Sequence, residues 1–167
     1  MLLRAASEMA PAGTTITIDS IEGIPVYNQD IEDAGIPSRV QQLKDRISAS
    51  DGLLLVTPEY NNALPGPLKN AIDWLSRPPA DIPKVFRNRP VGVIGASAGA
   101  VGTALAQVAW LPVFRTLGMA PYFGARVLVP RAKDAFDDSG RLEDETIRGQ
   151  LQKFVHGFVE FVESCRK

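Results

Sequence analysis

The feature that most constrains the fold is an uninterrupted apolar run, Leu53 to Val56, that leads directly into a polar, proline-rich stretch. Four successive apolar residues are typical of a parallel strand covered on both faces, whereas a half-exposed antiparallel strand would alternate. Pro58 ends this strand and favours an extended conformation at Thr57. The sequence therefore predicts a central parallel strand and an α/β fold built around it.

The stretch after this strand predicts a loop and then a helix. Asn61-Asn62 and Pro65-Gly66 are turn signals, and Pro67 suits the first position of a helix, where its missing N–H is harmless. Residues at helical spacing give that helix one apolar face: Leu68, Ala71, Ile72 and Leu75. Open α/β sheets bind ligands at the carboxyl ends of their strands, so this loop is the first candidate binding loop.

Strand and helix patterns alternate along the rest of the chain. Further strands are predicted at Thr15–Asp19, Val91–Gly95 and Ala125–Val129. Further helices are predicted at residues 2–10, 38–48, 103–117 and 144–164. The alternation predicts a doubly wound parallel sheet, and a length of 167 residues predicts a single domain. We expect residues 21–35 and 132–141 to be loops, the second one exposed and tolerant of change.

Composition excludes several classes of function. A net charge of −1 gives no electrostatic case for nucleic-acid binding. The single cysteine, Cys165, excludes an intramolecular disulfide and a CxxC metal site, and we expect an inert thiol there. No apolar run approaches the roughly 20 residues of a membrane helix. We expect a cytoplasmic protein without a metal site.

A second candidate loop, Gly95 to Gly102, follows the predicted strand at 91–95. It opens a helix, whose N–H groups and dipole favour negative charge nearby, although its small residues also suit a close strand–helix turn. A dinucleotide fingerprint fails here, because Ser97 replaces the middle glycine and no acidic residue follows about 20 positions later. The next acidic residue is Asp134.

The segment Pro58-Glu59-Tyr60-Asn61, with Pro65 to Trp74 after it, resembles the signature of the NAD(P)H-dependent FMN reductase family. The similarity extends through most of the chain. It implies a flavodoxin-like, three-layer α/β fold, with FMN as cofactor and NAD(P)H as co-substrate. It also implies that the flavin ring is contacted by Pro58, Glu59, Tyr60 and Asn61 from the first loop and by Ser97 and Gly99 from the second.

The same resemblance leaves one part of the family pattern without a counterpart. Family members begin with an apolar strand and a Gly-Ser-rich loop that wraps the FMN phosphate, whereas this sequence begins at the helix that would follow. In the flavodoxin-like strand order, that strand would lie between Thr15–Asp19 and Leu53–Val56. We therefore expect a domain, residues 1–167, that lacks its first strand and binds FMN weakly.

The implied function is transfer of hydride from NAD(P)H through FMN to quinones, dyes, metal oxyanions or free flavin, with no catalytic side chain assigned. The acceptor and the choice between NADH and NADPH stay open. The alternatives are a flavodoxin-like electron-transfer or interaction module and a relative that has lost its cofactor. Hydrolysis is disfavoured, because there is no GxSxG elbow for His156, the single histidine. Glu59 is open to two roles, a proton donor or a contact at the ring edge or the surface.

The helix predicted at 103–117 is apolar nearly all round, and Pro112 should bend it. Burial within one chain is one explanation. A subunit interface is the other, and the resemblance supports it because members of the family are dimers or dimers of dimers. We expect a homodimer or homotetramer in which Trp110 and Phe114 lie at the interface.

Overall fold

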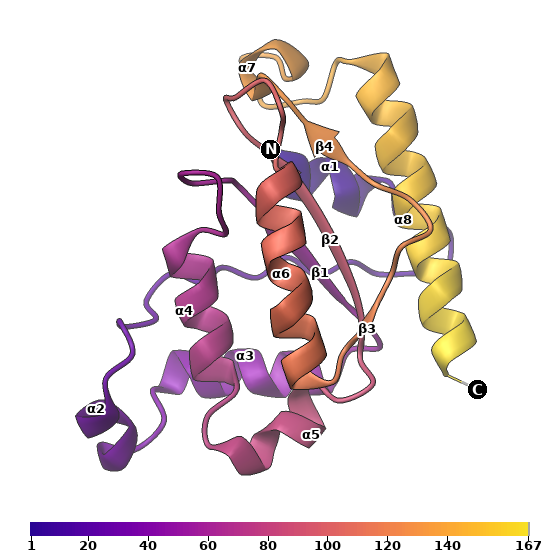
Figure 1. Cartoon of the computed structure of the whole chain (residues 1–167). Helices are drawn as coiled ribbons and strands as arrows, with labels where there is room; N and C mark the ends of the chain where they lie inside the picture. The colour runs from indigo at the N-terminus through magenta and orange to yellow at the C-terminus, as the bar shows by residue number, and fades with distance from the viewer. Residues whose placement is uncertain (167) are drawn as a thin grey trace.

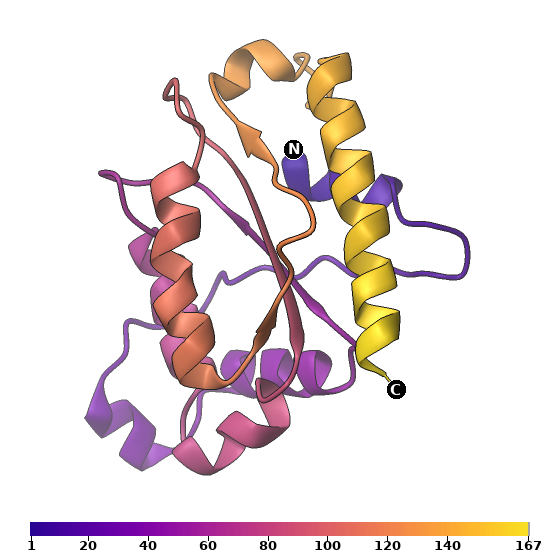
Figure 2. The ribbon, with the colours of Figure 1, turned by 45° about the vertical axis from the view of Figure 1, so that its right-hand side comes forward.

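The computed structural model describes residues 1–166, in which a parallel sheet separates two layers of helices (Figures 1 and 2). The strands are β1 (Leu53–Thr57), β2 (Pro90–Ala96), β3 (Ala120–Pro121) and β4 (Leu128–Val129). The helices are α1 (Leu2–Glu8), α2 (Gln29–Ala34), α3 (Ser38–Ser48), α4 (Gly66–Leu75), η1 (Pro79–Asp81), α5 (Ile82–Val85), α6 (Ala104–Leu117), α7 (Ala132–Ala135) and α8 (Glu145–Cys165).

Every strand pairing in the described sheet is parallel, and β2 is its centre. β1 pairs with one edge of β2 from Leu53 opposite Val91 to Thr57 opposite Gly95. β3 and β4 both pair with the other edge of β2, at its start and at its end. The predicted α/β class is confirmed, but only Leu128 and Val129 of the strand predicted at 125–129 join the ladder.

Two apolar clusters, one on each face, hold the layers together. Figure 2 shows the sheet between α6 on one side and α8 with α1 on the other. One cluster joins α1 and α8 to the sheet and includes Ile94 and Phe154. The other joins α3, α4, α5 and α6 to it and includes Leu55 and Trp110. β1 and β2 read as nearly continuous apolar runs because helices cover both of their faces.

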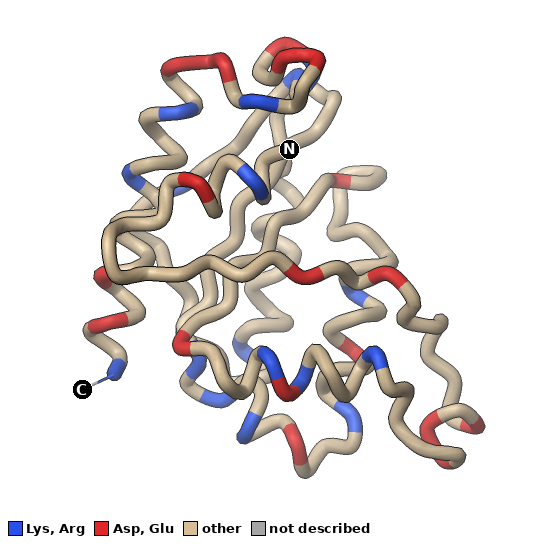
Figure 3. Tube along the Cα trace, turned by 180° about the vertical axis from the view of Figure 1, so that it is seen from behind, with Lys and Arg blue, Asp and Glu red and all other residues tan. Residues whose placement is uncertain are grey.

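The strand predicted at Thr15–Asp19 is wrong. This segment has no ladder partner, and in Figure 3, which views the molecule from behind, its trace passes in front of the sheet. A cavity lined by residues 13–21 on one side and 49–56 on the other separates it from β1. Alternating β-branched residues favour a strand, but a strand forms only where a neighbouring backbone supplies hydrogen bonds.

Both predicted loops contain helix. Residues 21–35 include α2, which begins where the Asn28 side chain accepts a hydrogen bond from the Asp30 N–H. Residues 132–141 include α7, and Phe136 at its end is buried in the core with Leu142. The second segment is therefore not a loop of uniform exposure, because an apolar anchor interrupts its polar residues.

At Gly95 the strands β1 and β2 lie close to Thr103, the residue before α6. A Cβ atom there would overlap the Thr57 carbonyl oxygen and the Thr103 hydroxyl. Gly99, four residues later, has open space, since its nearest neighbouring atom is the Ser97 hydroxyl oxygen at 3.7 Å. There is therefore no room for a side chain at Gly95, whereas Gly99 has room for one.

We predict that Gly95→Ala lowers the free energy of unfolding by about 2 kcal/mol or more, because the Thr57 backbone carbonyl and the Thr103 side chain must both move to admit the methyl group. Gly99→Ala is the matched control and should change stability by less than about 0.5 kcal/mol. Urea unfolding followed by circular dichroism measures both. Equal effects of the two substitutions would contradict the close packing at Gly95.

Candidate active site

The first candidate loop is built on a tight two-residue turn. Tyr60 and Ala63 exchange both backbone hydrogen bonds, at 3.1 and 3.0 Å. The two residues between them, Asn61 and Asn62, have φ values of 50° and 59°. Two-residue turns of this kind require positive φ, and asparagine adopts it more readily than most side chains. The turn presents Tyr60, which is 54% exposed, and the exposed Asn61 at the tip.

Glu59 joins this loop to α6. Its carboxylate oxygen Oε2 accepts hydrogen bonds from the backbone N–H groups of Leu105 and Ala106, both at 2.9 Å. These N–H groups belong to the first turn of α6, where they have no partner within the helix. The carboxylate also lies at the positive end of the helix dipole. Glu59 is therefore a helix cap supplied from a distant loop.

This geometry bears on two interpretations of the sequence. Oε2 of Glu59 is engaged by two backbone N–H groups, so this carboxylate has a structural role as a helix cap. The first turn of α6 likewise receives an internal anion, so these N–H groups are not free for a ligand. Nothing local marks this role, because Glu59 lies 46 positions before Leu105.

The second candidate loop, residues 95–102, is stabilised by an internal hydrogen bond and by the backbone of residues 131 and 132. The Ser97 hydroxyl donates to the Gly102 carbonyl oxygen at 2.6 Å. The carbonyl oxygens of Ser97 and Gly99 accept hydrogen bonds from Ala132 and Arg131, each at 2.9 Å. The Ser97 side chain thus stabilises its own loop, whereas Gly99 is exposed.

The six predicted site residues lie on two neighbouring loops. The loops leave the carboxyl ends of β1 and β2, which pair as far as Thr57 and Gly95. Two of the predicted side chains, Glu59 and Ser97, are engaged within the protein, while Tyr60 and Asn61 face outward. The crevice beyond adjacent parallel strands is where α/β proteins of this type bind cofactors.

A cavity of about 990 Å³ begins at this crevice. Pro58 and Tyr60 line it at the carboxyl end of β1, and it continues along that strand. Its volume lies within the range of about 300–1,000 Å³ typical of ligand sites. Both arginines that line the cavity, Arg46 and Arg166, pair with aspartates.

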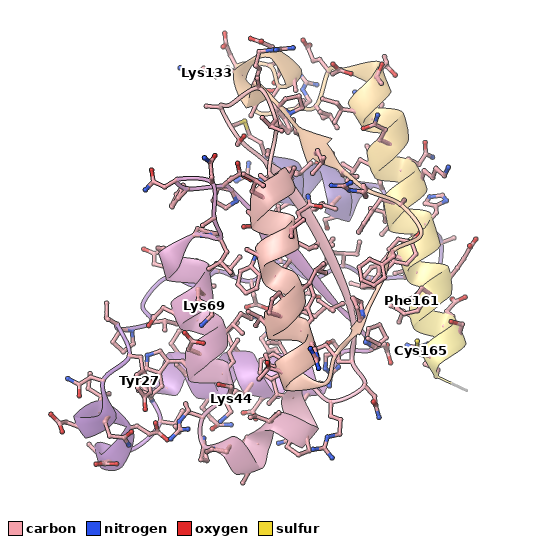
Figure 4. The ribbon with its side chains drawn as sticks, in the orientation of Figure 1. Tyr27, Lys44, Lys69, Lys133, Phe161 and Cys165 are labelled. Atoms are coloured by element: carbon pink, nitrogen blue, oxygen red, sulfur yellow. The ribbon has the colours of Figure 1, made fainter. Side chains whose placement is uncertain are left out.

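Other chemically reactive residues lie outside this crevice. His156 is exposed on α8, and Cys165 is exposed near the end of the same helix (Figure 4). Within residues 1–166 there is no group of three or more His, Cys, Asp or Glu residues arranged to hold a metal ion. No helix in the described part of the chain has the length and hydropathy needed to cross a membrane.

A second polar cluster stabilises the opposite end of the molecule, where Figure 4 labels Tyr27 and Lys44. The Arg77 guanidinium donates to Glu32 at 2.8 Å and holds the pKa of that carboxyl below its ordinary value. The hydrogen bond to Glu32 raises the pKa of the Tyr27 hydroxyl. Buried Lys44 pairs with Asp81. These contacts attach α2 and η1 to the body of the protein.

Comparisons with known proteins identify the family of this chain. The family model for NADPH-dependent FMN reductases matches residues 1–134. An NAD(P)H-dependent FMN reductase of Pseudomonas aeruginosa is 39% identical over 98% of this chain and 87% of its own length. A 2-hydroxy-1,4-benzoquinone reductase of Burkholderia is 35% identical over 99% of this chain and 88% of its own length.

A solved structure agrees in three dimensions as well as in sequence. The flavoenzyme NAD(P)H:(acceptor) oxidoreductase FerB of Paracoccus denitrificans superposes with a TM-score of 0.86 and 34% identity, covering 98% of this chain and 88% of that one. The chain therefore belongs to the NADPH-dependent FMN reductase family. It is an oxidoreductase with a flavodoxin-like fold, and the cofactor of its family is FMN.

We predict that Glu59→Ala lowers the free energy of unfolding by about 1–2 kcal/mol, because the first turn of α6 loses its cap. Glu59→Gln should cost less, since an amide oxygen still accepts one of the two hydrogen bonds. Amide hydrogen exchange at Leu105 and Ala106 should be faster in both variants. Unchanged exchange at these two positions would show that the cap contributes nothing in solution.

Proposed function

We propose that this protein transfers hydride equivalents from NAD(P)H through FMN to a small-molecule acceptor, and that the acceptor class is quinones. The observation that carries the proposal is the pair of loops at the carboxyl ends of β1 and β2, in a chain that belongs to the FMN reductase family. Relatives named quinone reductases support the choice of acceptor. In this proposal residues 1–167 act as one flavodoxin-like domain.

The proposed site residues divide into those that contact the ring and those that hold the loops. Pro58, Tyr60 and Asn61 would contact the isoalloxazine ring of FMN, with Gly99 approaching it from the second loop. Glu59 and Ser97 would hold the two loops at a fixed separation through the contacts that they make within the protein. When bound, FMN supplies the redox chemistry by accepting hydride from the nicotinamide and passing electrons to the acceptor.

The exposure of the loop tip suits this chemistry. Tyr60, Asn61 and Gly99 border open solvent, so a nicotinamide and then a quinone can reach the same ring face in turn. A planar aromatic acceptor would stack on such a face and be positioned by Tyr60. An electron-transfer protein without turnover would instead reduce its flavin only slowly with NAD(P)H.

We predict that replacing Tyr60 by Ala and Asn61 by Gly together weakens flavin binding by about tenfold, since stacking and one hydrogen bond are lost. Glycine is chosen at position 61 because it keeps the positive φ of the turn. Fluorescence titration with lumiflavin isolates the ring contacts from those of the phosphate, and FMN is titrated in parallel. Tyr60→Phe, which keeps the ring, is the control and should bind lumiflavin normally.

Stopped-flow mixing with NADPH and NADH tests the activity itself. An enzyme bleaches its bound flavin rapidly and restores the colour when a benzoquinone is added. Unchanged lumiflavin affinity in the double variant would contradict the assignment of the loop. Slow bleaching with both nucleotides would contradict reductase turnover, and the two results are independent of each other.

We also propose a cytoplasmic homo-oligomer, with the outer face of α6 as its interface. The expectation that Trp110 and Phe114 lie in the interface is wrong, because these side chains are 0% and 2% exposed within one chain. The apolar residues that α6 and the preceding loop present to solvent are Val101, Leu105, Val108 and Leu111. A contiguous exposed apolar face of this kind is typical of a subunit contact.

We predict that Leu105→Glu with Val108→Glu converts the oligomer to monomers without loss of folding, because both side chains are about half exposed in the single chain, at 49% and 57%. Light scattering at micromolar concentration measures the mass. Val26→Glu is the control, since Val26 is 82% exposed and lies away from α6. A monomeric unmodified protein would exclude the interface.

A further inference from the structure

A third loop at the carboxyl edge of the sheet follows β4, and its backbone is attached to the second candidate loop. The Arg131 N–H donates to the Gly99 carbonyl oxygen and the Ala132 N–H to the Ser97 carbonyl oxygen, each at 2.9 Å. Because β4 pairs in parallel with the end of β2, both loops leave the same edge of the sheet. Figure 1 shows α7, which begins at Ala132, beside the loop between β2 and α6. Arg131 is therefore fixed next to a loop that would approach the flavin.

The backbone conformation of Arg131 is unusual for its residue type. Its φ and ψ are 40° and 54°, in the left-handed region. Four non-glycine residues of the described chain have positive φ, and the other three are asparagines, Asn61, Asn62 and Asn88. Asparagine adopts this conformation more readily than arginine, since its short polar side chain can hydrogen-bond locally. The backbone here would suit an asparagine or a glycine better, so the presence of a long cationic side chain needs a reason of its own.

The charge of Arg131 is only weakly offset within the protein. The ion pair that it makes among the described residues is with Asp134, with 3.8 Å between Nε and Oδ2. This separation exceeds a hydrogen bond, and both side chains are largely exposed, so the pair contributes little. Lys69, a cation near the start of α4, is by contrast hydrogen-bonded to Asp73 at 2.6 Å. The guanidinium of Arg131 is thus available to an anionic ligand.

The electrostatic surroundings of Arg131 favour such a ligand. Residues 82–133, which include β2, α6, β3 and β4, contain no aspartate or glutamate. The carboxylate of the first loop, Glu59, is already paired with two N–H groups of α6. Lys133, which Figure 4 labels, is also exposed, and Asp134 offsets one of the two positive charges. A net positive charge therefore lies beside the crevice that an anionic nucleotide must approach.

The shape of the guanidinium narrows the kind of anion. Arginine presents its N–H donors in a planar fork that matches two oxygens of one phosphate group. NADPH differs from NADH by a 2′-phosphate monoester, a group that carries close to two negative charges at neutral pH. In dinucleotide-binding proteins of other folds an arginine accommodates this phosphate. The phosphate also lies far from the nicotinamide ring, so a residue beyond the flavin contacts is the kind that can reach it.

We propose that Arg131 is a specificity-determining residue, which selects NADPH over NADH by pairing its guanidinium with the 2′-phosphate of NADPH. This inference rests on the proposed function, because it concerns the co-substrate of the same crevice. The two backbone hydrogen bonds to the second loop fix Arg131 relative to the flavin contacts. The 2′-phosphate is then held while the nicotinamide lies on the flavin, and NADH gains nothing from this residue.

The test compares Arg131→Asn with the unmodified protein, both saturated with FMN. Asparagine suits the left-handed backbone and removes the charge, so the variant should be at least as stable to heat. Stopped-flow reduction of the bound flavin should give an apparent Kd for NADPH about tenfold higher in the variant. The apparent Kd for NADH and the limiting rates of reduction should not change. Calorimetric titration with NADP⁺ and NAD⁺ measures the same difference in affinity without turnover.

Lys133→Gln is the matched control, because it removes a positive charge two positions away from Arg131. It should raise the apparent Kd for NADPH by less than about twofold, as expected for an exposed charge that makes no direct contact. Raising the salt concentration of the unmodified protein from about 50 mM to about 500 mM should reduce the preference for NADPH, since salt screens a partly exposed ion pair. In Arg131→Asn the preference should be small at both concentrations.

Four results would overturn the proposal. Equal weakening of NADPH and NADH would place Arg131 at the diphosphate that both nucleotides share. Weaker FMN binding with unchanged selectivity would place it at the flavin phosphate. Equal effects of Arg131→Asn and Lys133→Gln would show general electrostatic attraction in place of a specific contact. Equal affinity of the unmodified protein for NADP⁺ and NAD⁺ would show that there is no selectivity to explain. Failure of both reduced nucleotides to bleach the flavin would contradict the proposed function, and the NADP⁺ titration would still decide the role of Arg131.

Discussion

The arrangement of the crevice depends on the contact between the Glu59 carboxylate and the first turn of α6. A helix start leaves backbone donors unpaired, and a loop that leaves a strand has no fixed direction of its own. The Glu59 carboxylate accepts hydrogen bonds from two of these N–H groups, and the same contact fixes the direction of the loop that bears Tyr60 and Asn61. The loop after β1 and the helix after β2 therefore act as one structural unit.

This unit rests on close packing beneath it. Gly95 allows β1, β2 and Thr103 to approach within a distance that excludes any side chain. The two loops consequently begin side by side, and their tips border one crevice. In the function that we propose, the flavin lies in this crevice, and the exposed tip would let two substrates use the same ring face in turn.

The side of β1 away from β2 has a different character. There, apolar walls from both helical layers and an unpaired strand edge surround a cavity rather than a neighbouring strand. Sheets normally protect such an edge with charges, prolines or a covering element. Here the segment 14–19 lies across the cavity from β1 without pairing with it.

The sequence by itself determined the elements whose signals are local. The apolar runs at Leu53–Val56 and Val91–Gly95, the turn residues Asn61-Asn62 and the helix start at Asp144 all lie where the patterns predicted. Tertiary structure alone decided the features that need a partner distant in sequence. Whether Thr15–Asp19 becomes a strand depends on a neighbouring edge, and the cap that Glu59 provides depends on a helix 46 positions away. Side-chain exposure on α6 was ambiguous for the same reason, because periodicity cannot show which of several apolar faces the sheet covers. Hydrogen bonds and burial between remote segments are properties of the packed chain, and no local pattern encodes them.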